Sequence, residues 1–160
     1  MQSIYWQSAA AASATPRGCT NFKLRQVARL ATRHYESFVA PTGLKITQYT
    51  LLTHVDRLGP LRAGELAAAM GLSASALSRN LQPLVSAGWV ELTPGADARS
   101  RMVSITAAGR AQRQLAQRAW KQAQLAFNQR LGVERVAALH ALLDECVQAL
   151  GDDAEDSDDD

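Results

Sequence analysis

Residues Leu61 to Gly109 read LRAGELAAAMGLSASALSRNLQPLVSAGWVELTPGADARSRMVSITAAG, and this stretch decides the fold. Gly71 separates two short helical patterns, because glycine tolerates the backbone that ends a helix. Ser73 is well placed to cap the second helix. Farther on, segments 89–93 and 101–106 are rich in strand-forming residues and flank the turn sequence PGADARS. The stretch therefore predicts a helix, a turn, a second helix and a two-stranded ribbon, with Leu61-Arg62 as a short edge strand.

The second helix of this stretch is predicted to have one buried face and one polar face. Its apolar side carries Leu77, Leu81, Leu84 and Gly88, at the spacing of a face packed on a core. The opposite side is polar and carries Ser75, Arg79, Gln82 and Ser86. Pro83 removes the backbone hydrogen bond to Arg79, which can kink a helix.

A pair of helices that meet at a glycine turn can present the second helix to the major groove of DNA. Arginine and glutamine can make bidentate contacts with guanine and adenine edges, so Arg79 and Gln82 are the candidate base readers. The alternative is that they are ordinary solvated positions. On the ribbon, Asp97 lies close enough to orient Arg99 or Arg101, and Arg99 is the candidate for insertion into a narrow minor groove.

Composition limits the class of protein. The chain has 160 residues, enough for one domain with a real core. No run approaches the ~18 uncharged apolar residues of a membrane span, and the N-terminus lacks a basic region before a long apolar core. We therefore expect a soluble cytoplasmic protein without a signal peptide.

Charge is distributed unevenly along the chain. Seven of the 15 acidic residues follow Gly151, in the segment DDAEDSDDD, which leaves eight acidic side chains against 17 basic ones in the rest. A basic body favours a polyanionic partner. The acidic segment, residues 152–160, is predicted to be a disordered tail that either aids solubility or competes with DNA for the basic surface.

The flanking segments are predicted to be helical. Residues 1–17 show no sustained period and are expected to be a flexible extension, and residues 18–151 one domain. Within it, 44–109 form the winged lobe and 18–40 and 107–151 the dimerisation helices. Thr47 and Thr106 are the expected N-caps of helices that end at Gly59 and Gly132. The last helix has an apolar stripe, made of Val136, Leu139, Leu143, Cys146, Val147 and Leu150. This apolar surface exceeds what a small lobe can cover and implies a dimer interface.

The chain resembles the multiple-antibiotic-resistance regulator (MarR) family from about Cys19 to Leu150. The ribbon carries the most specific part of the resemblance, Asp97-Ala98-Arg99-Ser100, then Val103-Ser104-Ile105-Thr106, then Gly109. This matches the family's D-x-R-S, V-x-L-T and glycine pattern, with Ile105 in place of leucine. The stretches LSRNL at 77–81 and AGWV at 87–90 also match.

The resemblance implies a mainly α fold with a small β-hairpin wing, a winged helix-turn-helix with N- and C-terminal dimerisation helices. It also implies a homodimer that represses transcription from a pseudo-palindromic operator. The helix 73–87 would enter a major groove and the Arg99 wing the flanking minor groove. The expected DNA-binding residues are Ser73, Ser75, Ser78, Arg79, Gln82, Asp97, Arg99, Ser100 and Arg101.

Many family members release DNA when a small phenolic or other aromatic acid binds between the dimer helices and the lobe. The corresponding candidates here are His34, Phe38, Tyr49 and Trp120, which have core or interface packing as their alternative role.

Two thiols leave a second mode of regulation open. Cys19 lies at the start of the first helix, where some relatives carry a peroxide-sensing cysteine, and a helix N-terminus favours the thiolate. It sits two residues farther from Gln48-Tyr49 than the sensing cysteine does, and the supporting tyrosine is absent. Cys146 is expected to be a small buried hydrophobe.

Other functional classes have less support. His34, His54 and His140 fall on separate predicted helices without HExxH or CxxC spacing, and there is no glycine-rich phosphate loop. We expect no enzyme activity, no metal site and no cofactor. The alternative from a different class is a winged-helix module for protein contact or non-specific nucleic-acid binding.

Overall fold

The fold follows the helical and strand patterns of the sequence closely. The computed structural model describes residues 17–95 and 101–155, with side chains as far as Gly151. The elements are α1 (Thr20–Val39), the short 3-10 helix η1 (Ala40–Thr42), α2 (Ile46–Leu58), β1 (Leu61–Arg62), α3 (Ala63–Ala69), α4 (Ala74–Ser86), β2 (Val90–Pro94), β3 (Arg101–Ile105), α5 (Ala107–Leu131) and α6 (Val133–Glu155). The predicted mainly α fold with a small β-ribbon is confirmed.

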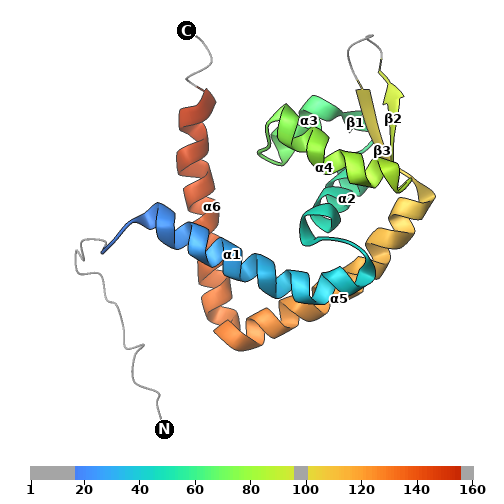
Figure 1. Cartoon of the computed structure of the whole chain (residues 1–160). Coiled ribbons are helices and arrows are strands. Elements are labelled where there is room, and N and C mark those ends of the chain that lie inside the picture. The colour runs from blue at the N-terminus through green and yellow to red at the C-terminus, as the bar shows by residue number, and fades with distance from the viewer. Residues whose placement is uncertain (1–16, 96–100, 156–160) are drawn as a thin grey trace.

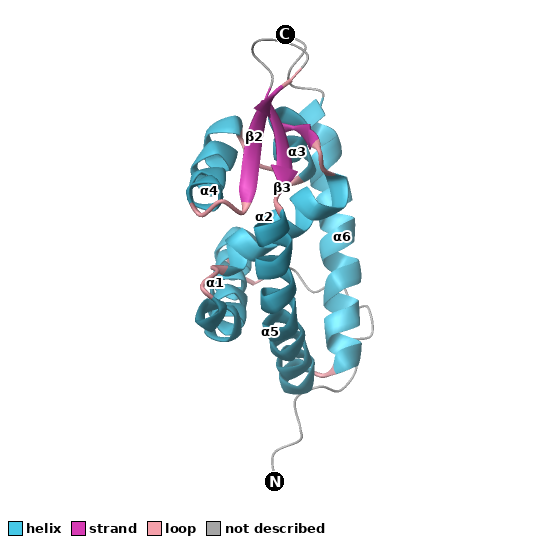
Figure 2. Ribbon diagram, turned by 90° about the vertical axis from the view of Figure 1, so that its right-hand side faces the viewer, coloured by secondary structure: helices cyan, strands magenta, loops and turns pink. Residues whose placement is uncertain are grey.

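The chain has a lobe and a set of long helices (Figure 1). The winged lobe comprises α2, α3, α4 and the sheet. The arm helices are α1, α5 and α6. Helices α1 and α5 lie side by side, whereas α6 turns back from the end of α5 and stands apart from the lobe (Figures 1 and 2). No described helix is long and apolar enough to cross a membrane.

The described strands form an antiparallel sheet in the order β1-β3-β2. In β2 and β3, Val90 pairs with Ile105 and Pro94 with Arg101. Leu61 pairs with Val103, so the edge strand predicted at Leu61-Arg62 is confirmed. Strand β3 is thus central, and it continues through one residue into α5.

The core lies beneath α4, between that helix, α2 and the sheet. It contains Leu51, Leu52, Val55, Leu66, Leu77, Leu81, Leu84, Val90 and Val103, all buried. The predicted apolar face of α4 is therefore confirmed for its three leucines. It is wrong for Gly88, which lies beyond the helix, is exposed, and has a φ of +70° in the turn that leads to β2.

The N-caps show where the local sequence was sufficient to predict the first residue of a helix. Ser73 accepts a hydrogen bond from the Ala76 N–H, at 3.3 Å, and Thr106 accepts one from the Gly109 N–H, at 3.0 Å, so both predicted caps are confirmed. Thr47 is not an N-cap, because α2 begins at Ile46. Two side chains bind backbone N–H groups at this start: Gln48 of α2 accepts from the Lys45 N–H, at 2.8 Å, and Glu36 of α1 accepts from the Ile46 N–H, at 2.7 Å.

The arm helices carry their apolar residues outward. Gly132 separates α5 from α6 with a φ of +90°, as the break in the pattern predicted. On α6, Val136 is buried, whereas Leu143, Val147 and Leu150 are exposed. The prediction of a buried Cys146 is wrong for the single chain, because the thiol is exposed among the described residues.

Candidate nucleic-acid interface

Helix α4 is held by its apolar face and turns its polar face outward. The buried leucines anchor it to the core, and Ser73 caps its first turn. On the opposite side, the side chains of Ser75, Ser78, Arg79 and Gln82 are all exposed. Arg79 and Gln82 are thus free to reach outward, as base contacts require. The helix continues through Pro83 to Ser86.

A hollow separates the polar face of α4 from the base of the wing. Its volume is about 360 Å³, and its apolar lining includes Leu77, Leu81 and Leu92. Ser78 and Gln82 of α4 line the same hollow as Arg101 of β3. The structure therefore brings Arg101 to the same side of the lobe as two of the predicted α4 residues.

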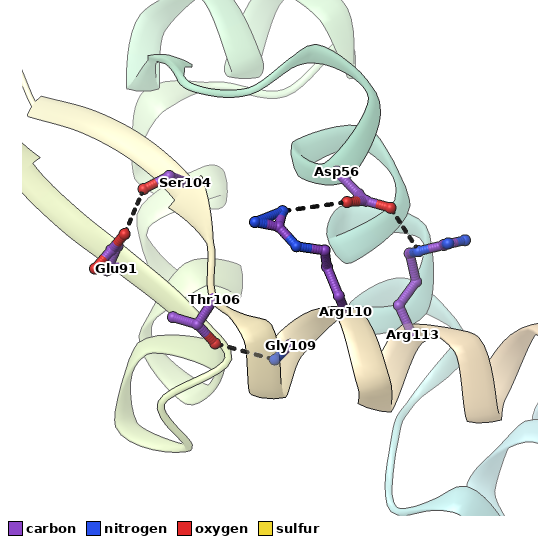
Figure 3. Close-up of polar contacts among 7 residues, drawn as sticks. All are labelled: Asp56, Glu91, Ser104, Thr106, Gly109, Arg110 and Arg113. Carbon is purple, nitrogen blue, oxygen red and sulfur yellow. Dashed lines mark hydrogen bonds and ion pairs between the residues drawn. The ribbon is translucent and has the colours of Figure 1, made fainter.

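The wing is anchored at its base. Ser104 of β3 donates a hydrogen bond to Glu91 of β2, 3.0 Å long, across the two strands (Figure 3). The predicted wing residues Asp97, Arg99 and Ser100 lie outside the described residues. Their role in the minor groove stays a prediction.

The turn between α4 and β2 is attached to the start of α5. The Thr106 N–H donates to the Trp89 carbonyl, at 3.1 Å, and the Thr106 hydroxyl donates to the Gly88 carbonyl, at 2.7 Å. That hydroxyl also caps α5 by accepting from Gly109 (Figure 3). A Cβ at Gly109 would meet the Trp89 carbonyl oxygen, so only glycine allows this approach. This contact is the physical reason why residue 109 of this chain is glycine.

The structure shows one group of charged residues that the sequence did not indicate. Asp56 of α2 lies between two arginines of α5: its Oδ2 is 2.9 Å from Arg113 Nε, and its Oδ1 is 3.7 Å from Arg110 Nη1 (Figure 3). These residues are far apart in sequence and belong to no short motif. Nothing in the spacing of either helix pattern could have paired them.

The four candidate ligand residues fall on α1, α2 and α5, the helices expected to line the crevice. Tyr49 stacks on Trp120 with ring centroids 6.2 Å apart, and Tyr49 is only 6% exposed. Burial raises the pKa of Tyr49 above its usual value near 10.0. The ring centroids of His34 and Phe38 are 5.4 Å apart, and His34 Nε2 lies 2.8 Å from the Ala123 carbonyl oxygen. The described ring contacts thus form two groups, the Tyr49–Trp120 pair and the rings around His34. The Tyr49–Trp120 pair belongs to the core of the lobe.

His34 also lines an apolar hollow. This hollow has a volume of about 310 Å³ and lies between α1 and the end of α5. Its lining includes Val27, Leu30 and Phe127, together with the charged side chain of Arg130. Cys19 is exposed and is the N-cap of α1, so its predicted place at the start of the helix is confirmed. Within residues 17–95 and 101–151, no three His, Cys, Asp or Glu side chains gather as metal ligands.

Comparisons with known proteins agree on one family. Residues 42–100 match the sequence model of the MarR family. The structure is similar to that of the M. tuberculosis transcriptional regulator MosR in complex with DNA, with a TM-score of 0.71 and 31% identity over 83% of this chain and 98% of that one. It is also similar to a mutant of MarR from E. coli complexed with operator DNA, with a TM-score of 0.72 and 25% identity over 79% and 92% of the two chains.

A curated relative supports the same assignment. The HTH-type transcriptional regulator YwoH of Bacillus subtilis is 27% identical over 84 residues, which cover 52% of this chain. The match spans 61% of the length of YwoH, less than two thirds of that relative. With the fold, the capped α4 and the α5 junction, these similarities show that the chain belongs to the MarR family of winged helix-turn-helix transcriptional regulators.

Proposed function

We propose that the protein is a homodimeric repressor that binds a pseudo-palindromic operator through α4 and the wing. The observation that carries this proposal is the polar face of α4. It offers Arg79 and Gln82 to solvent while the opposite face is fixed in the core, and Arg101 lies beside it. A helix held in this way can enter a major groove without rearrangement. The excess of basic side chains outside the acidic tail supplies attraction to phosphate.

The outward apolar surface of the arm helices supports a homodimer. On α1, Phe22 is 62% exposed and Val27 51%, and on α6 Val147 is 74% exposed. Between α1, α5 and α6 lies an apolar hollow of about 510 Å³ lined by Leu24, Leu139 and Leu143, among others. A contiguous apolar surface of this kind is typical of an interface. A second copy would cover it and set the distance between the two α4 helices.

The base-reading role is tested with a duplex selected by the wild-type protein from a random pool. Arg79→Ala should cost ~1–3 kcal/mol of binding and relax preference at one base pair of each half-site. Arg99→Ala should weaken binding with little change in that preference. The control is Arg118→Ala, which removes an exposed arginine of α5 outside the winged lobe.

The same assay separates the alternative functions. A repressor should prefer the selected duplex over random DNA by ~10³ or more at physiological salt. Equal affinity for both duplexes would instead support a module for non-specific nucleic-acid binding. If Arg79→Ala and Arg99→Ala both bound like wild type, the DNA-binding surface would lie elsewhere.

Release by a small aromatic ligand is the proposed means of regulation. The His34–Phe38 group and the hollow beside it offer rings and apolar walls next to α5, which joins the arm helices to the lobe. The measurement is binding of the selected duplex during titration with phenolic and aromatic carboxylic acids. A ligand in this hollow should lose its effect in Phe127→Ala, which removes a ring from the lining. Release that is unchanged in this variant would place the ligand elsewhere.

Oxidation of Cys19 is the second candidate for regulation, because the thiol is exposed at the start of α1. The thiolate is the form of a cysteine that reacts with peroxide. Duplex binding is compared before and after mild peroxide treatment in the wild type and in Cys19→Ser. Equal affinity in all four samples would eliminate this mode.

A further inference from the structure

The winged lobe is joined to α5 at one end by the chain itself. Strand β3 enters α5 through Thr106, and the hydrogen bonds of Thr106 to Gly88 and Trp89 attach the end of α4 at the same place. This junction by itself leaves rotation about one point, so contacts farther along α5 must fix the angle between the lobe and α5. One of them is apolar: Tyr49 of α2 stacks on Trp120 of α5, and Ala116 of α5 is buried in the core of the lobe.

Asp56 and Arg113 form a second attachment, on a different element of the lobe. Asp56 lies near the C-terminal end of α2, and Arg113 lies farther along α5 than the Thr106 junction. Their side chains are 21% and 17% exposed, and Arg113 Nε is 2.9 Å from Asp56 Oδ2. Arg110 is a weaker partner, 54% exposed and 3.7 Å away.

Because this pair is mostly buried, replacing Asp56 is expected to disturb the contact between α2 and α5. Arg113 Nε is buried and lies 2.9 Å from Asp56 Oδ2, whereas Arg113 Nη1 donates a hydrogen bond to Gln117 Oε1 at 3.3 Å. Gln117 is neutral, so the Asp56 carboxylate is the neighbour that compensates the arginine charge. Removing one member of a mostly buried ion pair leaves the other charge without compensation. The arginine is then expected to move toward water, and the contact between α2 and α5 loosens.

The other end of α2 is attached to the arm helices as well. Glu36 of α1 accepts from the Ile46 N–H, and Gln112 of α5 donates to the Thr42 carbonyl just before α2. Helix α2 is thus held at its start by hydrogen bonds and near its end by Asp56. Together with the Thr106 junction and the stacking of Tyr49 on Trp120, these contacts define one orientation of the lobe on α5.

We propose that Asp56 is a positioning residue, whose ion pair with Arg113 fixes the angle of the winged lobe on α5. This inference rests on the proposed DNA-binding dimer, because the angle sets the separation of the two α4 helices. One base pair of B-DNA spans about 3.4 Å along the helix axis, so a small rotation changes the half-site spacing that fits. Asp56 touches no base. It acts on spacing preference through α4.

The first test measures the angle without DNA. Spin labels are placed on cysteines introduced at Ser86 of α4 and Gln129 of α5, both exposed, in a Cys19→Ser, Cys146→Ser background. Labelled protein is diluted with unlabelled protein, so that distances within one chain are measured by pulsed electron paramagnetic resonance. Asp56→Asn should broaden the distance distribution. The control Arg110→Gln removes only the weaker partner and should leave it narrow.

The second test measures how the affinity for DNA depends on the spacing between the two half-sites. The duplex selected by the wild type is compared with versions that have one base pair inserted or removed between the half-sites. The wild type should lose ~10-fold or more in affinity on either change, which corresponds to about 1.4 kcal/mol. Asp56→Asn should lose less than about threefold, since its two lobes adapt to either spacing. All measurements are made well below the melting temperature of each variant.

The outcomes separate this inference from the proposed function. An unchanged distance distribution in Asp56→Asn, or wild-type discrimination of spacing by that variant, would overturn the positioning role. A broadened distribution in Asp56→Asn, with a wild type that binds random and selected duplexes equally, would support the role of Asp56 on α5. That combination would refute sequence-specific DNA binding.

Discussion

Replacing Gly109 with alanine is expected to destabilise the protein strongly, because the new methyl group has no room. A Cβ there would lie 2.9 Å from Ile105 Cγ1 and closer still to the Trp89 carbonyl oxygen, whereas ordinary contacts are 3.4–4 Å. The Trp89 carbonyl cannot simply move away, since it accepts the Thr106 N–H at 3.1 Å. Relief requires the first turn of α5 to separate from the α4–β2 turn.

The cost can be estimated from the contacts involved. Overpacking with backbone displacement costs about 1–3 kcal/mol. Separation of the two segments also weakens the hydrogen bonds of Thr106 to Gly88 and Trp89, at about 1 kcal/mol each. Alanine recovers about 1 kcal/mol through its better helix propensity. The expected net loss is about 2–4 kcal/mol of unfolding free energy.

The assay is urea denaturation followed by circular dichroism, at one fixed protein concentration because dimerisation contributes to apparent stability. Gly64→Ala is the matched control. Gly64 also lies in a helix, α3, and a Cβ there has no atom within 4 Å, so its stability should be unchanged or slightly raised. A Gly109→Ala protein within about 1 kcal/mol of wild type would refute the packing argument.

Three further predictions follow from other contacts. Thr106→Val keeps the shape of the side chain but removes the cap of α5 and the bond to Gly88, so it should cost about 1–2 kcal/mol in the same urea assay, with an unchanged m value. Because burial raises the pKa of Tyr49, the contribution of its neutral phenol to stability is complete below pH ~10 and is lost as the pH rises above that value. Tyr49→Phe should flatten the fall in stability above pH ~10, and an equal fall in both proteins would contradict this reasoning. Deleting the residues after Gly151 should tighten non-specific DNA binding at low salt and steepen its salt dependence; no change would leave the acidic tail as a solubilising segment.

Much of the fold was predictable because its signals are local. The spacing of Leu77, Leu81 and Leu84 identifies the buried face of α4 from the period of a helix alone. Ser73 and Thr106 cap helices within their own first turns, so sequence neighbours suffice to recognise them. The exposed face with Arg79 and Gln82 follows from the same period.

The features that were missed depend on segments that meet only in the fold. Thr47 has the chemistry of an N-cap, but α2 begins at Ile46, where Gln48 accepts from the Lys45 N–H and Glu36 of the preceding helix accepts from the Ile46 N–H. Only the Glu36 contact depends on the fold. Cys146 lies on an apolar stripe, yet Cys146 and its neighbour Val147 are exposed in the described part of the chain. A stripe in the sequence indicates which face avoids water and leaves open what covers it.

By itself the sequence determined the helices, the hairpin, the polar face of α4 and the family motif of the wing, since each depends on residues close together in the chain. Only the tertiary structure decided why Gly109 must be glycine and that Asp56 lies between Arg110 and Arg113. The physical reason is the same in both cases. A carbonyl approaching from another turn and a charge approaching from another helix are specified by packing, and periodicity describes only one segment at a time.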